Sequence, residues 1–326
     1  MDELSTAPQP RLPARSLTLL LAPRASLKVG KSLPPLLAKI LGRGERLRPV
    51  ESGRDAQLMR VFDVLPRRIA VAPLTRHVDA GDADSGVWVR ADPAHVRADM
   101  TCARMLACGE LGVSTEEAEQ FMSALRPLFG DEGFPISAPV PSRWYLMVPA
   151  QSKLPPFVPP ADALGDDLHA HMPAGDAGRR WRRLLNEAQV ILHNHPVNES
   201  RMEVGMLAVN SLWFWGAGAL PDHVRAEAVR IASDDPVVRG LAQRAGIPLS
   251  HPFAGALKQE SRPNVVDISG LRDVSLLDSV WLERCMSGLA SDRYASLRLD
   301  FADGTIHEWR HSYRWRVLRR PASRIA

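Results

Sequence analysis

Cysteine is scarce in this chain, which has three among 326 residues: Cys102, Cys108 and Cys285. They are odd in number and none belongs to a C-x-x-C pair, so the sequence offers neither a disulfide framework nor a cysteine-ligated zinc site. We therefore expect a reducing, cytoplasmic environment.

Long apolar runs are also lacking. Near the N-terminus the most apolar run is Leu17–Ala22, which is shorter than the core of a signal peptide and far shorter than a membrane span. We expect no export and no membrane partner. The formal net charge of +4 is small for this length and does not by itself indicate nucleic acid.

Apolar residues are plentiful at 45%, enough for two domains or for one large α/β domain with an insertion. Period-two and short apolar runs predict strands at 16–22, 68–73, 86–90, 143–149, 211–215 and 265–268, and a hairpin of 294–301 with 305–318 about Asp303-Gly304. Helical spacing predicts a helix from Pro34 to Gly42 or Gly44, and further helices at 94–107, 115–129, 178–192, 237–245 and around 276–289. Ser114 and Glu117 are expected to form a capping box at the start of the helix 115–129.

Strands that alternate with helices predict an α/β sandwich. We expect a tail at residues 1–15, an α/β core made of 16–85 and 155–326, and an inserted α+β subdomain at 86–154.

Histidine, asparagine and tryptophan concentrate in Ile191–Gly218. His193 and His195 follow a predicted helix, where imidazole can interact with the helix dipole and the last carbonyls, or can act as a general base or a phosphate contact. They are the candidate catalytic residues.

The same run contains candidate ligand-binding residues. Asn198 and Asn210 can close a loop or hold a substrate hydroxyl. Trp213 shares a strand face with Trp215, as part of a core or of a pocket wall. Gly216 and Gly218 allow backbone amides to approach an anion.

A second polar cluster, Asp92, His95, Arg97 and Asp99, falls at a predicted strand-to-helix turn. Such residues can bind a metal or position a substrate, while a helix cap by Asp92 and an ion pair of Arg97 explain them equally well.

Arginines and aromatic residues alternate near the C-terminus, at Arg310, Arg314, Arg316, Arg319 and Arg320 with Trp309, Tyr313 and Trp315. A basic aromatic ribbon can bind nucleic acid. A solvated outer strand explains the alternation better, so nucleic acid is not an expected partner.

Three motifs resemble those of the archaeal-type, cofactor-independent phosphoglycerate mutases, in the same order: His195-Pro196-Val197-Asn198, the segment Asn210–Gly218, and Asp235–Gly240 followed by Ala245-Gly246. A bacterial group related to these mutases, the RpfE-type regulatory proteins, is more similar still. It shares the patterns of Ala91–Met100, Leu192–Asn198 and Asn210–Gly218.

The resemblance implies an alkaline-phosphatase-like three-layer fold whose chemistry uses two divalent ions and a phosphorylated Ser or Thr. The family's Asp-Gly after the first strand is replaced here by Leu21-Ala22-Pro23, and no Asp-His-Gly ends a later strand. The resemblance therefore implies a catalytically degenerate protein with a binding or regulatory role and no cofactor.

We expect the two motif-rich runs to meet in one pocket for a small phosphorylated metabolite, and a regulatory protein as a second partner. The pocket would be lined by Asp92, His95, Arg97, Asp99, His193, His195, Asn198, Asn210 and Trp213. The alternative is an active phosphomutase or phosphohydrolase that uses Mn²⁺, Mg²⁺ or Zn²⁺, with His193, His195, Asp92 and Asp99 in a rearranged metal site.

Overall fold

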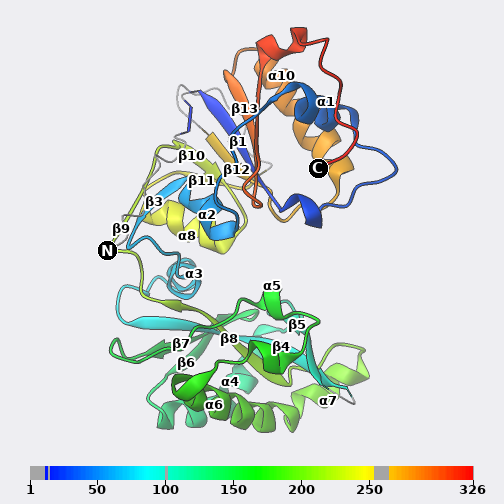
Figure 1. Ribbon diagram of the computed structural model, residues 1–326. Helices are drawn as coiled ribbons and strands as arrows, with labels where there is room; N and C mark the ends of the chain where they lie inside the picture. Colours follow the sequence, from blue (N-terminus) through cyan, green and yellow to red (C-terminus); the bar gives the residue numbers. More distant parts are fainter. Residues whose placement is uncertain (1–11, 14, 100–101, 253–263, 326) are drawn as a thin grey trace. The chain divides into compact units, whose positions relative to one another are not determined.

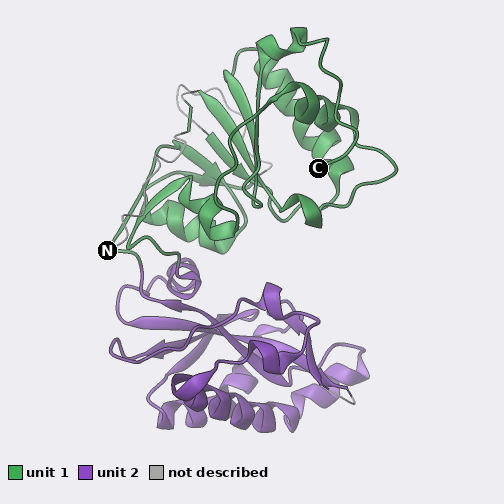
Figure 2. Ribbon diagram, in the orientation of Figure 1, with its two compact units in different colours: residues 1–69, 221–326 green, residues 70–220 purple. Residues whose placement is uncertain are grey.

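The computed structural model describes residues 12–13, 15–99, 102–252 and 264–325. The chain forms two compact units: unit 1 comprises residues 1–69 and 221–326, and unit 2 comprises residues 70–220 (Figure 2). The predicted N-terminal tail lies almost entirely outside the described residues.

Unit 1 is built on a seven-stranded mixed sheet in the order β11-β10-β12-β1-β13-β14-β2 (Figure 1). Its strands are β1 (Ser16–Leu21), β2 (Glu45–Arg46), β10 (Arg230–Ala232), β11 (Leu249–Ser250), β12 (Asn264–Asp267), β13 (Ser296–Phe301) and β14 (Ile306–Arg310). The first five in the order are parallel, whereas β14 and β2 are antiparallel to their neighbours. A separate pair, β3 (Phe62–Leu65) with β9 (His223–Ala226), is antiparallel.

The central strand β1 is buried along its whole length, as expected for a parallel strand covered on both faces. Leu17 and Leu19 pack in one core with residues of the helices α1 (Pro35–Arg43) and α10 (Glu283–Ala290). The remaining helical segments of unit 1 are η1 (Arg24–Ser26), α2 (Arg54–Met59), α8 (Pro236–Arg244), α9 (Val274–Leu276), the π-helical η3 (Leu277–Leu282) and η4 (His311–Trp315).

Helix α1 begins at two prolines, and its first free amides need partners from elsewhere. Asp278 in η3 supplies them: its carboxylate accepts from the amides of Leu37 (2.6 Å) and Leu36 (3.3 Å). This contact fixes α1 against the segment that continues into α10.

Unit 2 contains an antiparallel sheet in which β4 (Val87–Ala98) is the longest strand. The other strands are β5 (Ala103–Cys108), β6 (Ile136–Val140), β7 (Arg143–Val148) and β8 (Ser211–Gly218). Strand β4 pairs with β7 through residues 87–90, with β5 through 94–98 and with β8 through 88–94.

Two long helices, α4 (Thr115–Asp131) and α6 (Gly175–His193), cover one face of this sheet (Figure 1). The smaller segments are α3 (Val71–Asp79), α5 (Pro160–Ala163), η2 (Leu168–His171) and α7 (Val197–Glu203). The predicted capping box of α4 is present, with both Ser114–Glu117 hydrogen bonds formed. The predicted subdomain, residues 86–154, lies inside unit 2, which also contains α3, α6, α7 and β8.

The α/β class is confirmed, with a central mixed sheet and a separate antiparallel sheet. Two predicted elements are wrong. Residues 68–73 are not a strand, because α3 begins at Val71, and residues 94–107 are not a helix, because they form parts of β4 and β5. In both cases tertiary packing outweighs a local pattern.

The C-terminal strand also differs from its prediction. It ends at Arg310, and η4 follows. It is not an outer strand, because β13 and β2 flank it and Trp309 is fully buried. No helix in the described part of the chain is long and apolar enough to span a bilayer.

Candidate functional site

Pairing of β4 with β8 brings the two motif-rich runs together in unit 2. Asp92 lies opposite Trp213, and Ala94 lies opposite Ser211. The pairing continues beyond β8: Asn210 exchanges two hydrogen bonds with the backbone of Val96, at 2.8 and 2.7 Å. The runs therefore meet through backbone pairing.

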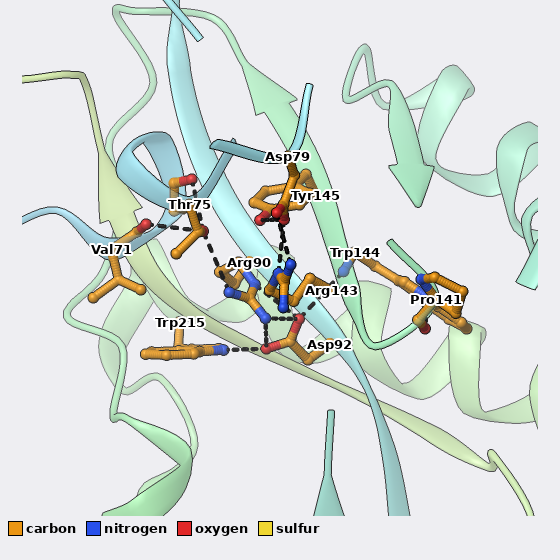
Figure 3. Close-up of polar contacts among 11 residues, drawn as sticks. Val71, Thr75, Asp79, Arg90, Asp92, Pro141, Arg143, Trp144, Tyr145 and Trp215 are labelled. Carbon is orange, nitrogen blue, oxygen red and sulfur yellow. Dashed lines mark hydrogen bonds and ion pairs between the residues drawn. The ribbon is translucent and has the colours of Figure 1, made fainter. Parts of the chain in front are cut away.

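Asp92 forms a buried ion pair with Arg90, two residues earlier on the same face of β4 (Figure 3). The guanidinium donates from Nε and Nη2 to the two carboxylate oxygens, both at 2.8 Å. The carboxylate also accepts from Trp215 Nε1 (2.7 Å) and from the Trp144 amide (3.2 Å). Burial raises the pKa of Asp92, while Arg90 and these donors oppose that rise.

Aromatic rings enclose Arg90. Its guanidinium carbon lies 5.2 Å from the centroid of the Tyr145 ring and 5.3 Å from that of Trp215. The Tyr145 hydroxyl donates to Asp79 (2.6 Å), which also accepts two bonds from Arg143 at 2.7 Å (Figure 3). The Asp92 carboxylate is thus an internal member of a hydrogen-bonded cluster that joins β4, β7, β8 and α3.

The two candidate histidines lie at the junction of α6 and α7. His193 is the last residue of α6 and is exposed. The ring of His195 packs on Phe121, with 4.7 Å between centroids, and its Nδ1 accepts from the Val197 amide (3.3 Å). Burial lowers the pKa of His195, so the neutral ring that accepts this bond is favoured.

Asn198 is buried and links α6 to the segment before β8. Its amide nitrogen donates to the carbonyls of Leu192 (2.7 Å) and Val209 (3.0 Å), and its oxygen accepts from the Val209 amide (2.8 Å). All three bonds are made with backbone groups. This is loop closure, the first of the two uses considered for Asn198 and Asn210.

Gly216 lies at an irregularity in the β4–β8 pairing and has a φ of +65°. A Cβ added there would lie 2.9 Å from Cβ of Val71, so the close approach of α3 requires glycine. Gly218 pairs with Trp88. Gly216 therefore allows the close approach of α3, and Gly218 takes part in the pairing of β8 with β4.

The remaining candidates have separate surroundings. His95 Nδ1 lies 2.8 Å from the carbonyl of Ala208, and Trp213 Nε1 donates to Val158 O (2.8 Å). Arg97 and Asp99 are exposed near the end of β4, where Arg97 lies opposite Arg104.

The structure does not bring Asp92 and His195 together. Ala91 belongs to the core that contains Phe121, the residue that contacts His195. Neighbouring side chains on a strand point to opposite faces, so Asp92 lies on the other side of the sheet. A pocket or metal site that combined these two residues would have to cross the sheet.

A different polar cluster lies in unit 1, at the carboxyl ends of the parallel strands β10 and β12. Ligands of open α/β sheets bind at this edge. Asp267 ends β12, and Asp235 follows β10 and caps α8 by accepting from the Val237 amide (2.8 Å). One nitrogen of Arg54, Nη2, donates to both carboxylates, at 2.6 Å to Asp267 and 2.8 Å to Asp235.

Asp267 has further donors. Its side chain is 2% exposed, and it accepts from the Ser233 hydroxyl (2.9 Å) and the Ser269 amide (3.1 Å). Burial opposes the charge of Arg54, but the two aspartates outweigh it and raise the pKa of the guanidinium. Arg54 therefore remains a cation fixed between the two carboxylates.

A cavity of about 580 Å³ adjoins this cluster within unit 1. It is lined by Asp234, Asp235, Pro252, Asp267, Ile268, Ser269, Gly270, Leu271, Arg272 and Trp281. The sequence interpretation missed this site. The available signal was an aspartate at or soon after the end of each of two short segments: Asp267 directly after Val265-Val266, and Asp234-Asp235 two residues after Ile231-Ala232.

The same edge of the sheet continues with other ion pairs. Arg60 donates to Asp300, the penultimate residue of β13, through bonds of 2.6 and 2.9 Å. Arg24, just after β1, holds Asp303 at 2.7 Å. Burial and the charges of Arg46 and Arg24 lower the pKa of His307 to about 4.

These residues do not fit a pair of divalent ions. Strand β12 does end in an aspartate, but Ile268 follows it where the mutase motif has histidine. Asp235, Asp267, Asp300 and Asp303 each already pair with an arginine. Across the described residues, no group of three or more His, Cys, Asp or Glu side chains is placed to hold a metal ion.

Comparisons with known proteins give a consistent but distant relationship. No family model matches the chain. It is 34% identical over 110 residues to a probable 2,3-bisphosphoglycerate-independent phosphoglycerate mutase of Geobacter sulfurreducens, across 33% of this chain and 27% of the relative. It is 30% identical over 93 residues to the corresponding mutase of Methanothrix thermoacetophila, across 27% of this chain and 24% of the relative. The chain thus spans about a quarter of the length of these curated relatives.

Solved structures align over most of the chain. PH0037 protein from Pyrococcus horikoshii aligns with 90% of this chain and 86% of its own, at 13% identity and a TM-score of 0.50, which indicates a shared fold alone. The cofactor-independent phosphoglycerate mutase from Thermoplasma acidophilum aligns with 91% of this chain and 90% of its own, at 17% identity and a TM-score of 0.43. On the sequence matches, the chain is distantly related to the archaeal-type, cofactor-independent phosphoglycerate mutases.

Proposed function

We propose that this protein is a catalytically degenerate relative of the phosphoglycerate mutases that binds a small phosphorylated metabolite and acts through binding. One observation carries the proposal. At the carboxyl edge of the parallel sheet, Arg54 pairs with both Asp235 and Asp267 and so occupies the place between the two carboxylates that a divalent ion would take. A guanidinium fixed between the two carboxylates takes up the lone pairs that a metal would need, and it cannot replace the metal's activation of a nucleophile.

The cavity beside this cluster is the proposed binding site. Arg272 is the cation in its lining, and a guanidinium is well suited to phosphate. Of the three aspartates in the lining, Asp235 and Asp267 pair with Arg54, and Asp234 lies 2.6 Å from His251 Nδ1. Each of the three carboxylates thus has a hydrogen-bonding partner, and Arg272 supplies the charge that would face a phosphate.

We also propose that the chain belongs with the RpfE-type regulatory proteins, on the motifs of Ala91–Met100, Leu192–Asn198 and Asn210–Gly218. A regulatory protein partner follows from that proposal. In unit 2, the contacts of Asp92, Asn198 and Asn210 support a structural use of those motifs, so we place ligand binding in unit 1.

The first test is turnover. The purified chain is assayed with 2- and 3-phosphoglycerate and with a generic phosphomonoester, in the presence of Mn²⁺, Mg²⁺ or Zn²⁺. The Methanothrix mutase serves as the positive control for substrates and metals. We expect no turnover and no retained metal, whereas metal-dependent turnover lost in His195→Ala would establish the active alternative.

The second test is binding. Titration calorimetry with 3-phosphoglycerate, without added metal, compares the native chain with Arg272→Gln. Arg284→Gln is the matched control, because Arg284 is an exposed arginine of α10 outside the cavity lining. We expect binding that Arg272→Gln weakens about tenfold or more and Arg284→Gln leaves unchanged. Equal affinity in all three proteins would remove the cavity from the proposal.

A further inference from the structure

The C-terminal segment of unit 1 carries a dense positive charge. Residues 309–326 contain no Asp or Glu and six arginines: Arg310, Arg314, Arg316, Arg319, Arg320 and Arg324. They lie beside the end of α1 and β2, which add Lys39, Arg43, Arg46 and Arg48 against Glu45 alone. The contact is direct, since the Ala322 amide donates to Ala38 O (2.8 Å) and Arg43 Nε donates to Arg319 O (2.9 Å) (Figure 1, red beside blue). We refer to these ten cationic residues as the basic surface.

Most contacts within the basic surface leave its charge in place. Arg316 donates to Arg43 O (3.3 Å) and Arg319 to Gly44 O (3.4 Å), so both arginines bond to backbone carbonyls. A carbonyl satisfies a donor but does not neutralise a cation. Among the described contacts, Arg310 is the member that pairs with a carboxylate, that of Glu308 (2.7 Å).

Three apolar side chains project beside this charge. Trp315 is 72% exposed, Val317 67% and Leu318 98%. They fall within four consecutive residues, so the exposed apolar side chains are concentrated in one short segment. Exposed apolar side chains flanked by arginines combine the two terms that hold a protein on an anionic bilayer: burial at the headgroup boundary and attraction to the surface charge.

We propose that Trp315, Val317, Leu318 and the surrounding basic surface dock on an anionic lipid surface, without a membrane span and independently of the proposed function. A nucleic acid is the less suitable partner. Binding of single strands uses several free aromatic rings. Here Arg316 lies over the Tyr313 ring at 3.4 Å, Glu45 accepts the Tyr313 hydroxyl bond (2.7 Å), and Arg314 lies over the Trp315 ring at 4.9 Å. Val317 and Leu318 have no use in stacking.

The experiment is vesicle co-sedimentation of the full chain. One set of vesicles is phosphatidylcholine alone, and the other contains about a third phosphatidylglycerol. We expect binding to the anionic set only, weakened severalfold when the salt rises from about 0.1 M to about 0.5 M. The double variant Val317→Ser with Leu318→Ser should weaken it about tenfold or more, and Arg314→Gln with Arg320→Gln severalfold.

Matched controls come from unit 2. Val190→Ser with Val204→Ser removes side chains that are 64% and 73% exposed, and Arg179→Gln removes an exposed arginine. These should leave vesicle binding unchanged, and all the altered side chains are on the surface, so melting temperatures should stay near that of the native chain. The proposal is overturned by no binding to anionic vesicles, by equal binding of the serine double variant, or by preferential binding to a single-stranded oligonucleotide.

Discussion

Replacing Asp92 by alanine separates a structural role of this residue from a ligand-binding role. The change removes the acceptor of four hydrogen bonds, two from Arg90 and one each from Trp215 and Trp144. Arg90, with a side chain 6% exposed, keeps its charge but loses its carboxylate. Arg90 would still donate from Nη1 to the Thr75 hydroxyl, at 3.3 Å.

The expected cost follows from that geometry. Removing one partner of a buried ion pair typically destabilises a protein by about 3–5 kcal/mol, because the other charge stays buried. Replacing both partners by apolar residues of similar size avoids that penalty. The double variant Arg90→Met with Asp92→Leu still leaves the Trp215 and Trp144 donors without their acceptor, but it removes the unpaired charge and should be about 1–3 kcal/mol more stable than Asp92→Ala.

Hydrogen exchange of backbone amides, followed by mass spectrometry, is the suitable assay. Peptides from β4 and β7 report the opening free energy of unit 2 itself, which a single unfolding transition of a two-unit chain does not isolate. Asp99→Ala, at the exposed end of the same motif, is the control and should cost less than about 1 kcal/mol. A cost below about 1 kcal/mol for Asp92→Ala, or a double variant as unstable as the single one, would refute the structural assignment.

Three other changes test separate features. The folded-state pKa of His307, about 4, lies below its ordinary value of 6.5, so protonation favours the unfolded chain and stability falls as the pH drops from 6.5 towards 4. In urea unfolding, the native chain should lose on the order of 2 kcal/mol more stability than His307→Leu between pH 7 and pH 4.5. A difference between the two proteins that stays constant with pH would contradict this. Asn198→Ala removes three buried bonds and should cost about 2–3 kcal/mol by hydrogen exchange, whereas a cost under about 0.5 would argue against loop closure. Gly216→Ala should cost about 1–3 kcal/mol, clearly more than the control Gly205→Ala. Both glycines have a positive φ, but only a Cβ added at Gly216 would meet Val71. Equal melting temperatures of the two variants would exclude that clash.

Local signals predicted the elements that local interactions determine. The Ser114–Glu117 capping box begins α4, and the amphipathic spacing from Trp181 to Leu192 forms the buried face of α6. Each signal lies within a few residues of the structure it forms, so it is readable without a partner. The same holds for the turn at Asp303-Gly304 between β13 and β14, where Gly304 has a φ of +82°.

The errors fall where pairing with distant segments decides. Residues 94–107 have helical spacing, yet Ala94 lies opposite Ser211 and Val96 opposite Met105 in the sheet. The burial of β4 between its neighbours determines its conformation, and β8, which contributes Ser211 opposite Ala94, lies far from β4 in the sequence.

The carboxyl-edge cluster was out of reach for the same reason. Arg54 meets Asp235 and Asp267 across separations of 181 and 213 residues. Each of these residues by itself looks like an ordinary surface charge. Only the parallel order of β10 and β12 places the two aspartates at one edge, and only the fold brings α2 to them.

The similarity to the mutases therefore says less about chemistry than its motifs suggest. The segment Asn210–Gly218 is one of the motifs that resemble the mutases, and in this chain its residues pair β8 with β4 and complete the hydrogen bonds of a buried Arg90–Asp92 pair. A buried polar network restricts residue type as tightly as catalysis does, because each unmet donor or acceptor costs free energy. Relatives can therefore share this segment through a common unit-2 architecture, whether or not they share a reaction. The chemistry is better judged at the carboxyl edge of unit 1, where arginine holds the carboxylates that a metal would need.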